Sequence, residues 1–154
     1  MGHIICAKAR APQNRSITPF ATVQHNRQQC FRLSGVMALL PSKTIETFPN
    51  PHPNNDYTIR FHTDEFTTVC PLTNQPDFAQ ITVEYSPDEL CLESKSIKQY
   101  LWSFRNEGHF HEDVTNILLN DMTRLCQPKW MTITGHYNIR GGIDFVITAR
   151  YVKP

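Results

Sequence analysis

The sequence predicts an α+β fold in which an antiparallel sheet carries two helices on one face. Three observations lead to it: apolar residues alternate with polar ones before residue 86, recur at helical spacing between residues 97 and 125, and alternate again from residue 131 to 151. Short turns join the neighbouring strands of each pair, and strands joined in this way run antiparallel. The expected order is strand, strand, helix, helix, strand, strand.

Two strands come first. A period of two places successive side chains on opposite faces, so each strand has one buried face. The apolar positions are Tyr57, Ile59 and Phe61 in the first strand and Ala79, Ile81, Val83 and Tyr85 in the second.

Two amphipathic helices follow, separated by a break at residues 106–108. Apolar residues three and four apart gather on one face of each helix. They are Ile97, Tyr100, Leu101 and Phe104 in the first helix and Val114, Ile117, Leu118, Met122 and Leu125 in the second.

A second pair of strands ends the chain. Met131 and Ile133 begin the third alternation, residues 140–142 form a turn, and a last strand runs from Ile143 to Tyr151. A small sheet has unpaired edges, and association of subunits into a ring would cover them. We therefore expect a homo-oligomer.

Charge divides the chain at residue 36. Residues 1–36 contain five basic residues and no acidic one, whereas the remainder is mildly acidic. This composition, without hydrophobic periodicity, predicts a basic, disordered N-terminal extension before a folded domain of residues 37–154. A transit peptide or a nucleic-acid arm would have the same composition, and Met37 would serve as an alternative start.

Other bulk properties exclude several classes of protein. No apolar run approaches the roughly 20 residues that cross a bilayer, and the N-terminus lacks a secretory pattern, so we expect a cytoplasmic protein without a membrane partner. The five cysteines are widely spaced and form no C-x-x-C pair. Free thiols are expected in place of a disulfide framework or a zinc ribbon.

One loop sets a thiol and a carboxylate seven residues apart, Cys70 and Asp77, with Pro71 and Pro76 between them. The prolines exclude a helix and stiffen a connection that turns back on itself, which would bring the two side chains to one site. A thiol with a pKa of about 8.5 needs a base or a positive field to act as a nucleophile. An ionised carboxylate would raise that pKa, so Asp77 suits a proton carrier. The alternative is a packed cysteine and a turn aspartate.

Two further groups carry polar side chains at helix starts. Glu93 and Ser94 precede Lys95 and Lys98, and the two lysines share one helix face. This face would bind phosphate groups, with the Glu93 carboxylate beside a pocket, or would be an ordinary solvent-exposed surface. His109, His111 and Glu112 stand at the start of the second helix. The two histidines lack a third metal ligand, so no metal is expected, and Glu112 would accept two N–H donors from a guanine-like edge or merely begin the helix.

Three segments, VCPLTNQPDF, ESKSIKQYLWSFRNEGHFHED and RGGI, resemble in order and spacing the NADPH-dependent 7-cyano-7-deazaguanine reductases of queuosine biosynthesis, in their short single-domain form. The likeness runs from about residue 44 to the C-terminus and leaves residues 1–36 without a counterpart. The resemblance implies the tunnelling fold, assembled as two stacked pentameric rings with purine-like pockets between subunits.

The resemblance also implies the chemistry: two NADPH reduce the nitrile of 7-cyano-7-deazaguanine to an aminomethyl group through a covalent thioimide. Cys70 corresponds to the nucleophile and Asp77 to the proton donor. The implied substrate residues are Leu92, Glu93, Ser94, His111 and Glu112, and the implied NADPH residues are Lys95, Lys98 and Arg140. No Gly-x-Gly-x-x-Gly motif follows a strand, so cofactor binding of the Rossmann kind is not expected.

Two other functions remain open. A zinc-dependent pterin synthase or cyclohydrolase of the same fold would use His109 and His111 as ligands, and full activity after chelation would exclude it. A non-catalytic binder of tRNA or a purine would use the basic extension, and its RNA binding would weaken steeply with salt. The mixed charges of residues 37–154 argue against a nucleic-acid partner.

Overall fold

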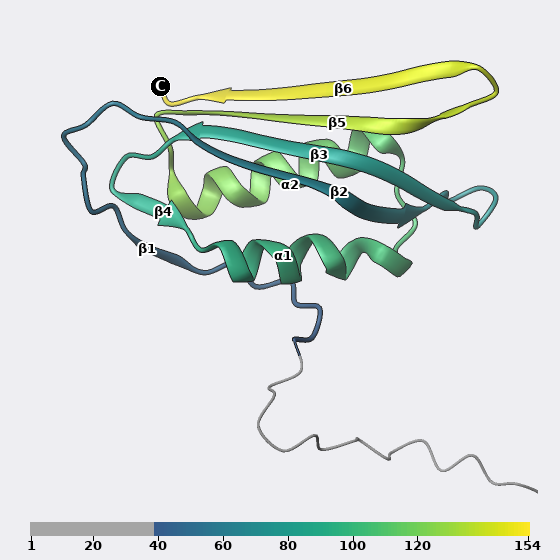
Figure 1. Ribbon diagram of the computed structural model, residues 1–154, viewed down its shortest axis with the longest axis horizontal. Helices are drawn as coiled ribbons and strands as arrows, with labels where there is room; N and C mark the ends of the chain where they lie inside the picture. The colour runs from purple at the N-terminus through teal and green to yellow at the C-terminus, as the bar shows by residue number, and fades with distance from the viewer. Residues whose placement is uncertain (1–38) are drawn as a thin grey trace, which may run out of the picture. The chain divides into compact units, whose positions relative to one another are not determined.

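The computed structural model describes residues 39–154, so the extension expected over residues 1–36 lies outside the described part. Four long strands form one antiparallel sheet in the order β2-β3-β5-β6. Helices α1 and α2 lie on the same side of this sheet (Figure 1). The long elements are β2 (Ile59–Val69), β3 (Pro76–Ser86), α1 (Ser94–Ser103), α2 (His111–Cys126), β5 (Trp130–Arg140) and β6 (Ile143–Val152). The predicted α+β class and the order of these six elements are confirmed.

Two short strands were not expected. β1 (Thr47–Pro49) pairs with β4 (Leu90–Leu92) just before α1 begins. Three residues are too few to display a period of two, which is why the pattern does not reveal them. A single 3-10 turn, η1 (Phe104–Asn106), also follows α1.

The core lies between the sheet and the two helices. The alternating residues of β3 and the apolar faces of both helices are buried in one cluster, and Leu118 and Met122 are 0% exposed. Full burial of such a side chain contributes about 1.5–3 kcal/mol. Ile59 and Phe61 are only partly buried, because β2 is an edge strand with no neighbour on one side within the described residues.

β2 departs from simple alternation. Its register with β3 shifts between Thr63 and Phe66, and this bulge moves the inward face onto Phe66 and Thr68. β3 keeps its alternation, so Asp77 lies on the same inner face as Ala79. The bulge therefore places Thr68 directly opposite Asp77.

The edges of the sheet are β2 and β6. Within the described chain each presents a row of backbone groups that no further strand covers, as the sequence predicts for a small sheet. None of the helices in residues 39–154 is long and apolar enough to span a membrane.

Candidate active site

Cys70 follows β2 directly and opens the hairpin to β3. Its backbone N–H donates to the carbonyl of Gln75 at 2.8 Å, and its carbonyl accepts from the N–H of Asn74 at 2.9 Å. Asn74 has a left-handed φ of 58°, a conformation that asparagine tolerates better than most residues. Cys70 thus closes a stiff turn, and its thiol is half-buried.

The turn after Cys70 favours the thiolate. Hydrogen bonds from the Thr73 side chain and then from the backbone of Leu72 and Thr73 lower the pKa of the Cys70 thiol, outweighing burial and the charge of Asp77, which raise it. Pro71 has no N–H, so Leu72 and Thr73 carry the first backbone donors after the cysteine. The positive field that a nucleophilic cysteine requires comes from the loop itself.

Asp77 lies beside this turn on the inner face of β3 and is 4% exposed. Its Oδ1 is 2.5 Å from Nη2 of Arg140, and its Oδ2 is 3.4 Å from Nε2 of His111. Its charge also reaches the Cys70 thiol. Thr68, opposite Asp77, carries the one buried side-chain oxygen in residues 39–154 that lacks a hydrogen-bond partner.

His111 begins α2 and is held by aromatic rings. Its ring stacks on Tyr137 with centroids 3.9 Å apart and an angle of 13° between the planes, and Phe145 lies 5.4 Å away. The Tyr137 hydroxyl donates to the carbonyl of His111 at 3.1 Å and contacts Thr115 at 3.0 Å. Burial raises the pKa of Tyr137 to about 12, so the phenol stays protonated at neutral pH. The imidazole is therefore oriented by packing, with Nε2 on Asp77.

Glu112 follows in the exposed first turn of α2. Its charge, like that of Asp77, contributes to the raised pKa of Tyr137, so both carboxylates lie within electrostatic reach of that hydroxyl. Five of the predicted residues, Cys70, Asp77, His111, Glu112 and Arg140, therefore gather at one end of the sheet.

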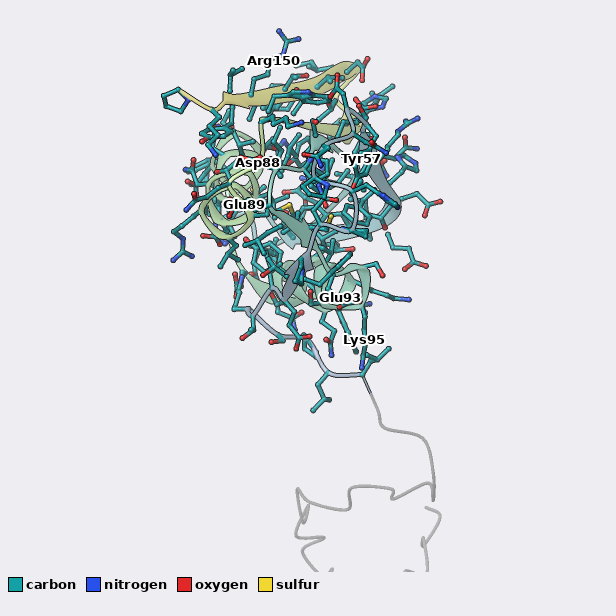
Figure 2. All side chains as sticks on the ribbon, turned by 90° about the vertical axis from the view of Figure 1, so that its left-hand side faces the viewer. Tyr57, Asp88, Glu89, Glu93, Lys95 and Arg150 are labelled. Atoms are coloured by element: carbon teal, nitrogen blue, oxygen red, sulfur yellow. The ribbon has the colours of Figure 1, made fainter. Side chains whose placement is uncertain are left out.

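The other predicted substrate residues lie elsewhere in the chain. Leu92 ends β4, and Ser94 begins α1. Glu93 caps α1: its carboxylate accepts from the N–H groups of Lys95 at 2.8 Å and Ser96 at 2.7 Å. Figure 2 shows Glu93 and Lys95 at the end of the fold that carries β4. The β2–β3 hairpin lies at the opposite end of α1 (Figure 1), and a ten-residue helix is about 15 Å long.

A groove of about 680 Å³ runs between β2 and α1. Aromatic and aliphatic side chains line it, together with Ser94, Lys98 and Arg105; they include Phe61, Phe66, Ile97, Leu101 and Trp102. Cys70 does not line this groove, so the groove and the candidate nucleophile are separate within one subunit. Arg140 also lies away from it, on Asp77.

Comparison with known proteins gives the family. A family model described as QueF-like protein matches residues 76–154. The NADPH-dependent 7-cyano-7-deazaguanine reductase of Thermomicrobium roseum is 56% identical over 117 residues, which cover 76% of this chain and 91% of that protein. The chain belongs to the 7-cyano-7-deazaguanine reductase family. The reductase of Syntrophus aciditrophicus is 53% identical over 114 residues, covering 74% of this chain and 81% of that protein.

A solved structure shares the fold of this reductase-family chain. It is the apo form of an archaeosine synthase QueF-Like, which aligns with a TM-score of 0.57 over 60% of this chain and 91% of its own. The two sequences are 24% identical in this comparison, so the likeness concerns the fold alone.

The two histidines of this reductase-family chain face different partners. His109 contacts Glu107 and Asp113, whereas His111 contacts Asp77. In residues 39–154 no three histidine, cysteine, aspartate or glutamate side chains gather as they would around a metal ion.

Two residues of this site were missed from the sequence. The Thr73 side chain lowers the pKa of the Cys70 thiol. The only feature of the sequence that could have indicated this role was a hydroxyl between the two prolines of the turn. Tyr137 supports His111, and it had no signal, because its position on β5 becomes relevant only when β5 pairs with β3 at Ala79.

Proposed function

We propose that this protein reduces the nitrile of 7-cyano-7-deazaguanine to the aminomethyl group of 7-aminomethyl-7-deazaguanine, with two NADPH, as a step of queuosine biosynthesis in the cytoplasm. The observation that carries the proposal is the placement of Cys70, with a thiol pKa lowered by its own turn, beside the nearly buried carboxyl of Asp77. The family relationship supports the substrate and the cofactor, because the curated relatives bear the name NADPH-dependent 7-cyano-7-deazaguanine reductase.

The first step forms a bond from the Cys70 sulfur to the nitrile carbon. The thiol proton passes to Asp77 and from there to the nitrile nitrogen, which yields a covalent thioimide with no net gain or loss of protons. A nitrile carbon is a poor hydride acceptor, and the thioimide carbon is a better one that is held in place. Asp77 is thus the proton carrier between sulfur and nitrogen.

Bound NADPH would supply the two hydrides, one for the thioimide carbon and one for the carbon of the imine that follows. Between them Cys70 leaves as thiolate, and each reduction takes one proton at nitrogen through Asp77. No glycine-rich motif is present to hold a dinucleotide, but Lys95 and Lys98 lie on the exposed side of α1, and Lys98 lines a groove with apolar walls. These features fit phosphate groups beside a flat ring.

The base of the substrate would be read by Glu112, whose carboxylate accepts two parallel N–H groups from a guanine-like edge, with His111 beside it. Leu92, Glu93 and Ser94 would close the other side of the base. Since about 15 Å of helix separates them from Cys70 within one subunit, they would come from a neighbouring subunit.

Two features support assembly into rings with sites between subunits, such as the two stacked pentamers of the resemblance. Both edges of the sheet are uncovered within the described chain. Apolar side chains are also exposed around the Cys70 end: Leu72, Phe78, Phe110, Ile139 and Ile143. Residues 37–154 would form this catalytic domain, with residues 1–36 as its extension.

The test is covalent capture without cofactor. Protein incubated with 7-cyano-7-deazaguanine alone should gain the mass of one substrate per subunit and the absorbance of a thioimide. Cys70→Ala should abolish the adduct, Asp77→Ala should impair turnover, and Cys91→Ala, which changes a buried cysteine, should leave the adduct intact. An undiminished adduct in Cys70→Ala would refute the assignment.

A further inference from the structure

A cluster of four charged or titratable side chains ties down the segment between η1 and α2. His109 lies at its centre: Nε2 is 3.3 Å from Oε2 of Glu107, and Nδ1 is 3.2 Å from Oδ2 of Asp113. The same Glu107 oxygen accepts from Nζ of Lys43 at 2.6 Å. We call Lys43, Glu107, His109 and Asp113 the clamp.

The clamp combines two carboxylates with one lysine and one histidine. A neutral imidazole has one N–H, so only the protonated ring of His109 donates to both carboxylates at once. Burial raises the pKa of Glu107, but hydrogen bonds from Lys43 and His109 outweigh it, so that the pKa is lowered. Phe104 lies beneath the cluster, with its ring centroid 5.6 Å from that of His109 and 3.2 Å from Nζ of Lys43.

The clamped segment runs alongside the end of β2. The Val69 N–H donates to the Glu107 carbonyl at 3.0 Å, and the His109 N–H donates to the Val69 carbonyl at 3.1 Å. Gly108 forms a parallel bridge with Val69 and has the backbone of Pro71 next to it. The residues on both sides of Cys70 therefore touch the segment that the clamp holds.

We propose that His109 is a positioning residue that sets the place of the Cys70 sulfur relative to the start of α2. Val69 immediately precedes Cys70, and the clamped segment leads within two residues to His111 and Glu112. Because Asp113 belongs to α2 and Glu107 to the connector, the imidazole of His109 joins the helix to the connector, whose backbone is hydrogen-bonded to Val69 of β2. The catalytic consequence rests on the proposed function, whereas the mechanical one does not.

The experiment compares the full-length protein with His109→Phe, which keeps a ring on Phe104 and removes both donors. Hydrogen exchange at the Val69 amide should accelerate by about tenfold, the size expected for one lost charge-assisted hydrogen bond, while the amides of Ile81 and Ile133 stay protected. At saturating 7-cyano-7-deazaguanine the rate of adduct formation should fall by about tenfold. Substrate affinity, measured in a Cys70→Ala background, should change less than about twofold, since α2 remains packed on the sheet.

His136→Phe is the matched control, because His136 pairs with Asp144 at 2.8 Å on the exposed β5–β6 hairpin and lies outside the site. It should change neither the exchange nor the rate. If His109→Phe does not fold, His109→Asn, which keeps one donor, and Lys43→Met should each give a smaller acceleration at Val69.

Unchanged exchange at Val69 would show that the clamp does not hold the segment beside the end of β2. Faster exchange with an unchanged rate of adduct formation would overturn the positioning role. A wild-type protein that forms no adduct would defeat the proposed function, and the exchange at Val69 would still decide whether the clamp exists.

Discussion

Arg140 lies on the carboxyl of Asp77: Nη2 is 2.5 Å from Oδ1 and also donates to the carbonyl of Pro76. The resemblance implied a place for Arg140 beside the NADPH phosphates, yet here it and His111 each contact one oxygen of the same nearly buried carboxyl. Arginine and histidine nitrogens are donors and carboxyl oxygens are acceptors, so these contacts would hold in place the group that takes the proton of Cys70 in the proposed reaction. We therefore expect Arg140 to act in the proposed first chemical step, through its contact with Asp77.

Replacing Arg140 should slow adduct formation when NADPH is absent. Arg140→Ala leaves a nearly buried carboxyl without its strongest partner, so the rate of thioimide appearance should fall about tenfold or more. Lys98→Ala is the control, because it should leave that rate unchanged and raise the KM for NADPH. If Arg140→Ala instead affects the KM for NADPH alone, its contact with Asp77 has no role in the chemistry.

Thr73 should determine the pH range in which the Cys70 thiol ionises. Its side chain is the largest cause of the lowered pKa of Cys70, so Thr73→Val should raise that pKa. The thiolate fraction at pH 7 then decreases, and alkylation of Cys70 by iodoacetamide, followed by peptide mass spectrometry, should slow and reach its half-maximal rate at higher pH. Thr73→Ser should restore the wild-type profile, and a Thr73→Val profile that coincides with the wild type would contradict the prediction.

Tyr137 should matter for its ring more than for its hydroxyl. Tyr137→Phe removes two hydrogen bonds but keeps the stack on His111, so the free energy of unfolding in urea should fall by about 1 kcal/mol. The rate of adduct formation should stay within about threefold of the wild type. Tyr137→Leu removes the stack and leaves a cavity, which should cost about 3 kcal/mol and slow the adduct further. Equal rates in the two variants would show that the stack does not orient His111.

If each site is shared between two subunits, mixing two inactive variants should restore part of the activity. Cys70 lies in the hairpin near one end of α1 and Glu93 caps the other end, so a ring containing both Cys70→Ala and Glu93→Ala subunits should hold some sites with an intact residue from each neighbour. Random mixing in equal amounts should restore about one quarter of the wild-type activity, since each half is intact with a probability of one half. Activity that stays at the level of the separate variants would show that each site is built within one subunit.

Prediction from the sequence succeeded where the signal is local. The apolar spacing in Val114, Leu118 and Met122 predicted α2, and these side chains are fully buried. Asp77, which was expected in the loop after Cys70, instead belongs to β3 and lies on its inner face, because the strand begins at Pro76. Local patterns could not predict the pairing of β1 with β4, or the bulge after Thr63 that moves Thr68 opposite Asp77.

The amino-acid sequence alone determined the four long strands, the two helices and the stiff turn at Cys70, because hydrophobic periodicity and proline act on neighbouring residues. Only the tertiary structure decided which side chains meet. Strand pairing and helix packing bring Arg140 to Asp77, Tyr137 to His111 and Lys43 to Glu107 across long stretches of chain. Such contacts depend on which elements pack together and on the direction in which each crosses the sheet, and the pattern of one element does not specify its partner.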